Sequence, residues 1–188
     1  TNALDAQIDN GNPTEPFDVH LPNDMEPFFS IRDFGTGLSH EDCMSLYTTY
    51  FRSNRTDSNE VAGCMGLGSK SPFAYNDSFS VESFYNGQHK VYSAYKNEKE
   101  EPVFALMSSK ETQERNGLRV SFPVNSDDNF DFEEEAKQLY TFFAVNPNIT
   151  GEEIEIKSPN YLIEGNDWAI HDGDDERDYN WDACAIMG

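Results

Sequence analysis

The order of elements along this chain predicts an α+β domain, with helices on one face of a mixed, mostly antiparallel sheet. Two helical segments separated by a strand come first, and a glycine-rich stretch, residues 63–71, follows them. Consecutive runs rich in Phe, Val and Tyr then indicate antiparallel strands. The chain has 188 residues, 13% of them aromatic, which is enough for one domain with its own core.

The first half of the chain is predicted to hold two helices and one strand. Helix-forming Ala and Leu residues indicate a helix end over 2–8, whereas Gly, Pro and Asn mark 10–24 as a loop. Alternating Phe and Ile residues predict a strand over about 27–33. Ser39 can cap a helix over about 40–51, because two acidic residues follow it in the first turn.

The second half is marked by Asn86-Gly87, the strongest short signal for a hairpin turn, between two β-rich runs. Pro72 is tolerated in the first turn of a short helix that follows the glycine-rich stretch. The remaining predicted elements are strands over 101–109, 117–124, 153–157 and 161–164, and an amphipathic helix over about 131–145.

Charge and composition exclude several classes of function. The formal net charge of -22 repels phosphate backbones, so direct nucleic acid binding by this segment is not expected. No run of about 18 apolar residues occurs, so membrane contact is expected to be peripheral only. Three cysteines indicate a reducing compartment such as the cytoplasm.

Neither end resembles a natural terminus, so we expect a fragment truncated at both ends. The acidic run 172–178 lacks the calcium-loop pattern and is expected to be solvated.

The stretch Gly63 to Ser71 looks like a phosphate-binding P-loop but does not match that motif. A P-loop lysine follows the second glycine directly, whereas Ser69 stands here between Gly68 and Lys70. The segment before it is polar, not a buried strand. The dinucleotide-binding pattern also fails, because Ser71 occupies the place of the third glycine.

Three separated segments together indicate a different nucleotide site. Asn2-Ala-x-Asp5-Ala, Asp33-x-Gly35-x-Gly37 and the glycine-rich stretch resemble, in this order, the three sequence boxes of the GHKL ATPases. That superfamily includes type II topoisomerases, ninety-kilodalton heat-shock chaperones, MutL and sensor histidine kinases. The resemblance implies a Bergerat-type two-layer sandwich that binds ATP and Mg²⁺. The third box supplies the nucleotide-contacting candidates Gly63, Gly66, Leu67, Gly68, Ser69 and Lys70.

Each box has a physical reason to contain these residues. A buried carboxylate at Asp33 can accept a hydrogen bond from the exocyclic amine of adenine, and Gly35 and Gly37 allow the backbone to approach the base. Consecutive N–H groups of the glycine loop can point at the triphosphate. The resemblance makes the amide oxygen of Asn2 the one protein ligand to magnesium, with Asp5, one helical turn on, supporting the site through water.

Two departures from the GHKL pattern leave the activity open. The general-base glutamate of the superfamily would lie four residues before Asn2, outside this sequence. Gly117 is followed by Leu118, where the superfamily commonly has a threonine that bonds the adenine site. An ATPase and a nucleotide-dependent switch or scaffold without significant hydrolysis therefore both remain. In either case the polar segment 50–63 would form a lid that orders on ATP binding and drives homodimerisation. Arg52 and Arg55 are equally well explained as phosphate contacts or as solvated loop charges.

A closer resemblance, to the phage rapid-lysis A protein family, is strongest at residues 57–87 and includes NGLRVSFPV, EGNDW and the terminal AIMG. It implies a lysis-inhibition protein in the cytoplasm of an infected bacterium, peripheral at the inner membrane, with the rapid-lysis B protein as partner. We expect residues 1–188 to form one domain. Its ATP-binding core would span 1–125, with 126–188 contributing a helix, short strands and an acidic loop packed on that core.

Overall fold

A computed structural model describes residues 2–48, 68–99, 101–159, 161–165 and 168–171 of the chain. The predicted lid, residues 50–63, lies outside these ranges. The first part of the glycine-rich stretch also lies outside them, including Gly63, Gly66 and Leu67. The acidic run 172–178 and the terminal AIMG also lie outside the described residues.

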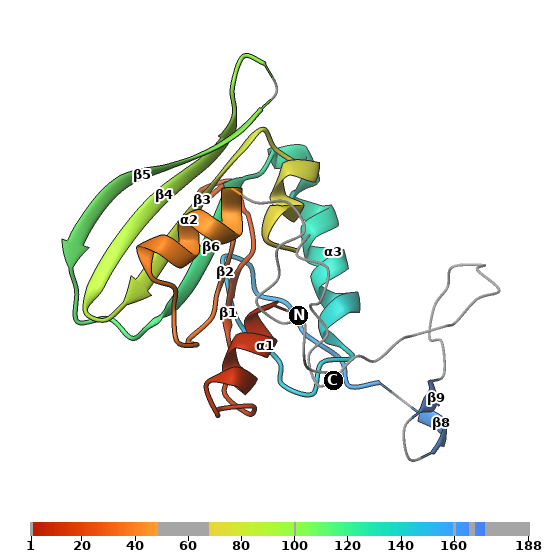
Figure 1. The fold of residues 1–188 in the computed structure, drawn as a ribbon. Helices are drawn as coiled ribbons and strands as arrows, with labels where there is room; N and C mark the ends of the chain where they lie inside the picture. The colour runs from red at the N-terminus through yellow and green to blue at the C-terminus, as the bar shows by residue number, and fades with distance from the viewer. Residues whose placement is uncertain (1, 49–67, 100, 160, 166–167, 172–188) are drawn as a thin grey trace.

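The described residues form a seven-stranded sheet in the order β5-β4-β3-β6-β2-β1-β7. Neighbouring strands are antiparallel except β1 and β7, which are parallel. Figure 1 shows the strongly twisted sheet with β5 at one edge. The strands are β1 (Asp18–His20), β2 (Phe28–Arg32), β3 (Ser78–Tyr85), β4 (Gln88–Lys96), β5 (Pro102–Glu111), β6 (Gly117–Pro123) and β7 (Asn148–Thr150).

Helices cover one face of this sheet, as Figure 1 shows for α2 in front of the central strands. The helical elements are α1 (Asn2–Asp9), α2 (His40–Thr48), α3 (Asn129–Tyr140) and the 3₁₀ segments η1 (Gly68–Ala74) and η2 (Ser126–Asp128). A separate two-stranded sheet joins β8 (Tyr161–Glu164) to β9 (Ala169–His171). Among the described residues, no helix has the length and apolar character needed to cross a membrane.

Two apolar clusters hold the helices to the sheet. Under α2, the ring of Tyr47 stacks on Phe104 at 4.8 Å between centroids, and the Cys43 side chain is fully buried. Under α1 and α3, Phe17 packs edge-on against Tyr140, with ring centroids 6.1 Å apart. Burying each such side chain contributes roughly 1.5–3 kcal/mol, which offsets the cost of ordering these short helices.

The opposite face of the sheet carries a row of serines. The strand registers place Ser30, Ser121, Ser80 and Ser93 in one row across β2, β6, β3 and β4. Alternate residues such as Val81 face the helices and are fully buried. The expected α+β class, with helices on one face of a mixed sheet, is therefore confirmed.

The local predictions differ from the structure at several places. The predicted loop 10–24 contains β1, which pairs with β2 and β7. No strand forms over 153–157, although Ile154 and Ile156 do pack against the core. The third helix starts at Asn129 and ends at Tyr140, five residues before the predicted end.

The predicted hairpin is confirmed. Its two turn residues, Asn86 and Gly87, both have positive φ, at 50° and 73°. Such angles suit the two-residue turns that match the twist of the flanking strands.

Candidate functional site

The structure brings described parts of all three predicted boxes together around α1. A Cβ added to Gly35 would lie 2.9 Å from both the Cβ and the carbonyl oxygen of Ala6. At the start of the same helix, a Cβ on Gly68 would lie 2.7 Å from the Asn2 side-chain nitrogen. Asn10, just after α1, donates to the Phe34 carbonyl at 3.1 Å. One helix thus contacts both the second and the third box.

Asp33 stands directly after β2, and its side chain is held in place by backbone donors. The residue is only 9% exposed. Its Oδ1 accepts hydrogen bonds from the N–H of Gly35 at 3.0 Å and of Leu118 at 3.1 Å. Two N–H donors on one carboxylate oxygen fix the orientation of the group. A hydrogen-bonding partner of the second oxygen would therefore meet a preset geometry.

The glycines around Asp33 are required by close contacts within the protein. A Cβ on Gly117 would lie 2.1 Å from the Asp33 carbonyl oxygen, and the φ of Gly117 is +143°. A Cβ on Gly37, at φ +72°, would lie 2.3 Å from the Phe84 carbonyl oxygen. These contacts add a reason for glycine that the sequence argument about an approaching base did not include.

A buried cation supports the strand end that carries Asp33. Arg32 is 4% exposed, and its guanidinium carbon lies 3.7 Å from the centroid of the Phe84 ring. Its Nη2 donates to the Arg115 carbonyl at 3.0 Å, and burial is the main cause that lowers its pKa. Cation–ring stacking in a desolvated site contributes on the order of 2 kcal/mol. Arg32 therefore fixes β2 immediately before the candidate site.

The third box enters the described structure at Gly68 and continues into η1. Gly68 is exposed, and its carbonyl accepts from the Ser71 hydroxyl at 2.8 Å. Ser69 lies in the first turn of η1. Lys70, predicted as a nucleotide contact, donates to the Leu46 carbonyl of α2 at 2.8 Å, and burial lowers its pKa. A cation suits the carbonyl end of a helix, so the ammonium has a structural use there.

The far end of η1 is anchored to α3. The Tyr75 hydroxyl bonds the Asp128 carboxylate and accepts from the Asn125 N–H at 3.2 Å. The Tyr75 ring packs on Phe122 and Phe132, with centroids 5.7 and 5.5 Å away. The C-terminal end of η1 is thus held against α3.

The first box carries the predicted magnesium ligand. The Asn2 side chain is exposed beside Gly68, whereas Asp5, one turn further on, is buried at 4% exposure. An amide oxygen is a hard donor of the kind Mg²⁺ takes when most of its shell comes from phosphate and water. Among the described residues, no group of three or more His, Cys, Asp or Glu side chains is arranged to hold a metal ion. The residues present fit a magnesium ion coordinated mainly by a phosphate ligand.

The role of the Leu118 backbone could not be predicted from the sequence. The leucine side chain cannot replace a threonine hydroxyl, yet the Leu118 N–H reaches Asp33 directly. Residue type gives no signal for this contact, because every non-proline residue carries an N–H group. The same holds for Ser83, whose buried hydroxyl donates to the Leu38 carbonyl at 2.6 Å and fixes the segment after Gly37.

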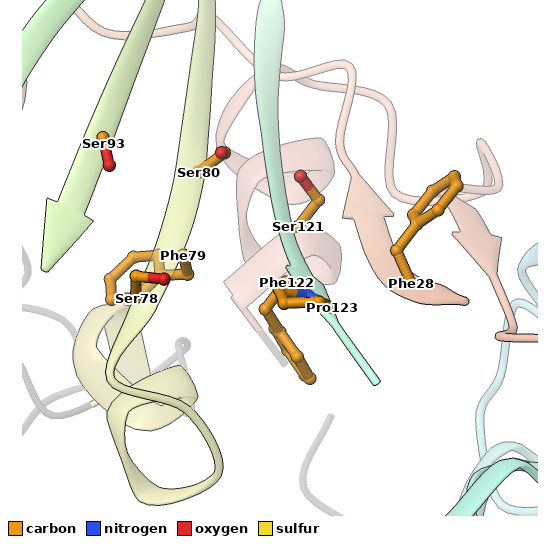
Figure 2. A pocket seen from close by; sticks show the side chains of 8 residues that line it. All are labelled: Phe28, Ser78, Phe79, Ser80, Ser93, Ser121, Phe122 and Pro123. Atoms are coloured by element: carbon orange, nitrogen blue, oxygen red, sulfur yellow. The ribbon is translucent and has the colours of Figure 1, made fainter. Parts of the chain in front are cut away.

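A hollow in the described structure lies away from these residues. Figure 2 shows it over the serine row, with side chains from β2, β3, β4 and β6. It encloses about 270 Å³. No charged residue lines it, so it lacks the groups that a nucleotide phosphate requires. Its lining consists of Phe28, Ser78, Phe79, Ser80, Ser93, Ser121, Phe122 and Pro123.

Comparison with known proteins identifies the fold. No family model matches the chain, and no curated protein matches it. Among solved structures, the ATPase and transducer domains of DNA topoisomerase II from Balamuthia mandrillaris superpose with a TM-score of 0.58 at 19% identity. This match covers 82% of the present chain and 46% of the other.

The ATPase region of Saccharomyces cerevisiae topoisomerase II gives a TM-score of 0.60 at 15% identity, over 83% of this chain and 47% of that one. The same yeast region bound to ICRF-187 (dexrazoxane) gives 0.61 at 15% identity, with the same coverage of both chains. The present chain therefore spans a little under half the length of these structures. It has the two-layer fold of their ATPase domains, as the sequence resemblance implied.

Proposed function

We propose that this chain is a GHKL-type domain that binds ATP with Mg²⁺. The observation that carries the proposal is the position of α1, which contacts Gly35 through Ala6 and Gly68 through Asn2. A single ligand beside α1 would therefore reach residues of all three boxes. The fold shared with topoisomerase II ATPase domains supports the same assignment.

Asp33 is the proposed adenine-recognition residue. Its Oδ1 already accepts two backbone N–H bonds, so the carboxylate is oriented before any ligand arrives. Accepting a hydrogen bond from the exocyclic amine selects adenine, because guanine presents a carbonyl oxygen at that position of the ring. A preorganised acceptor of this kind costs little entropy on binding.

The phosphates are proposed to lie against the backbone from Gly63 to Ser69, with magnesium held by the Asn2 amide oxygen. Asp5 is proposed to support the metal through a water molecule, because its own side chain is buried and does not reach the surface beside Asn2. Magnesium would supply positive charge between the phosphates. Because the Lys70 ammonium is bonded to the Leu46 carbonyl, the proposal gives it no direct phosphate contact.

The consequences of binding form a second part of the proposal. Residues 50–63 would close as a lid over the phosphates and promote a nucleotide-dependent homodimer. Residues 1–125 would be the ATP-binding core, with 126–188 packed on it; α3 is joined to η1 through Tyr75.

ATP hydrolysis is proposed, and a binding switch without turnover is the alternative. Single-turnover measurement of ATP hydrolysis by the full-length protein distinguishes these two.

A phage lysis-inhibition role is the finest level of the proposal, and it rests on the sequence segments alone. It places the protein in the cytoplasm of an infected bacterium, peripheral at the inner membrane, with rapid-lysis B as partner. Co-purification of the two tagged proteins from infected cells tests this level. Failure of that experiment would remove the lysis role and leave ATP binding untouched.

Calorimetric titration of the chain with ATP and magnesium tests the central assignment. The wild-type chain should bind one ATP, and Asp33→Asn should weaken binding by about tenfold or more. The asparagine oxygen can still accept the two backbone bonds, while its amide can present a donor to the adenine amine. Asp131→Asn, an exposed change on α3, is the matched control and should bind normally. Unchanged ATP affinity in Asp33→Asn would remove the adenine assignment.

A further inference from the structure

A small polar cleft lies between the start of α2 and the tip of the β3–β4 hairpin. It encloses about 100 Å³ and is separate from the serine-row hollow. Leu38 and His40 line it from one side, and residues of both hairpin strands line it from the other. The hairpin contributes Ser83, Tyr85, Asn86, Gln88 and Lys90.

Positive charge and hydrogen-bond donors dominate this cleft. No carboxylate is among its described lining residues, although the whole chain carries 35 acidic side chains and a formal charge of -22. The Lys90 ammonium makes neither an ion pair nor a hydrogen bond with any residue in the described ranges, unlike Lys96 and Lys137, which pair with carboxylates. An available lysine with no acidic neighbour in the cleft favours an anionic ligand.

His40 adds a second donor. Its Nδ1 lies 3.1 Å from the Tyr92 hydroxyl, and the two rings are stacked. A tyrosine hydroxyl keeps its proton at neutral pH and can donate it to Nδ1. In the tautomer that accepts this bond, the hydrogen of the imidazole is on Nε2, and Nε2 is then a donor.

The walls of the cleft are fixed. The Ser83 hydroxyl donates to the Leu38 carbonyl at 2.6 Å and accepts from the Leu38 N–H at 3.3 Å, which ties the segment before α2 to β3. The Asn116 side-chain oxygen accepts from the Asn86 N–H at 3.2 Å, which holds the hairpin tip. Donors on rigid elements lose little freedom when they bind a ligand.

The size of the cleft selects the class of ligand. Drug-sized molecules and nucleotides need cavities of roughly 300 Å³ or more, whereas this cleft has room for only a few heavy atoms. We propose that it binds a small oxyanion, a phosphate or a carboxylate group, through Lys90 with His40 and Gln88 as further donors. The site is distinct from the proposed ATP site, because no predicted box residue lines it.

Titration of the ¹⁵N-labelled chain with inorganic phosphate, and separately with acetate, tests this site by NMR. Ionic strength is held constant with chloride, so that screening does not change during the titration. Saturable shifts are expected at the amides of residues 38–40 and 83–90. The phosphate arm reports a phosphoryl ligand and the acetate arm a carboxylate ligand. Shifts confined to residues 63–69 would place the anion in the ATP site and overturn the proposal.

Lys90→Met should weaken anion binding by about tenfold or more, because it removes a charge-assisted contact. Lys110→Met is the matched control: Lys110 lies on the adjoining strand, opposite His89, on the other face of the sheet, and its loss should leave binding unchanged. Lys90→Arg retains the charge and should retain binding, which separates the charge from a folding defect. Equal binding by wild type and Lys90→Met, or no saturable shift at the cleft with either anion, would overturn the inference.

Discussion

The carboxylate of Asp33 is held by the backbone N–H of Leu118, 85 residues further along the chain, at 3.1 Å. Leu118 stands where the sequence departs from the GHKL pattern, and its side chain cannot form a hydrogen bond. The backbone of β6 nevertheless orients the carboxylate. The orientation of Asp33 therefore does not depend on the type of side chain at position 118.

Leu118→Ala tests whether the backbone or the side chain of this residue serves the site. We expect ATP affinity to change by less than about threefold, because the alanine N–H takes the same place. Stability should fall by roughly 1–3 kcal/mol, since the leucine packs partly buried against the core beneath α2. Calorimetry and urea unfolding measure the two quantities. A large loss of affinity with little loss of stability would contradict this account.

Gly35→Ala and Gly68→Ala form a matched pair. At Gly35 the new Cβ meets the backbone and Cβ of Ala6 at 2.9 Å, so α1 must move and stability should fall by about 1–3 kcal/mol. At Gly68 the nearest atoms that the new Cβ meets belong to the flexible amide of Asn2, so stability should change little.

The two variants should differ in their dependence on magnesium. Gly68→Ala displaces Asn2 and should weaken ATP binding in the presence of magnesium more than in its absence. Urea unfolding and calorimetry with and without magnesium provide the readouts. Equal destabilisation of the two variants would count against the described packing of α1.

Lys70→Met should leave ATP affinity within about threefold of wild type, because its ammonium is bonded to the Leu46 carbonyl. A lysine in direct contact with phosphate would contribute about tenfold or more to affinity. Stability should fall by roughly 0.5–1.5 kcal/mol from loss of the hydrogen bond to the Leu46 carbonyl. Asp33→Asn serves as the positive control for lost affinity in the same assay. A tenfold loss in Lys70→Met would restore the lysine to the phosphate site.

Cys43 predicts an alkaline dependence of stability. Burial raises the pKa of its thiol from the ordinary 9.0 to about 11. Above pH 9 the unfolded chain loses this proton before the folded chain does, so unfolding becomes more favourable as pH rises towards 11. The effect should be on the order of 1–2 kcal/mol.

Cys43→Ala provides the test, because alanine has no proton to lose. Its unfolding free energy should decline less steeply between pH 9 and pH 11 than that of wild type, whatever its absolute stability. Urea unfolding at several pH values measures both slopes. Identical slopes would contradict the assigned burial of the thiol.

Local signals in the sequence identified the elements that are long or have a clear turn. Asn86-Gly87 defined its hairpin, since few residue pairs adopt positive φ twice. The strand predicted over 153–157 does not form: Ile154 and Ile156 pack partly buried against the core, but these residues pair with no neighbouring strand in the described structure. The three-residue strand β1 could not be predicted, because its pairing with β7 joins residues about 130 positions apart.

In the candidate site, too, some features could be predicted from the sequence and others depend on tertiary packing. Asp33 and the glycines could be recognised from their order along the chain, because the proposed ligand chemistry restricts residue type at those positions. The contact of Ala6 with Gly35 and the binding of Lys70 to α2 could not, because both depend on how helices pack on the sheet. Side-chain direction near a glycine loop is set by tertiary structure, whereas motif spacing is set by sequence.

A crystal structure of the chain with magnesium and a non-hydrolysable ATP analogue tests the central claim most directly. The account predicts the adenine amine within hydrogen-bond distance of the Asp33 carboxylate, the phosphates against residues 63–69, and the metal bound by the Asn2 amide oxygen. Adenine bound away from Asp33, or phosphates bound away from Gly68 and Asn2, would contradict it.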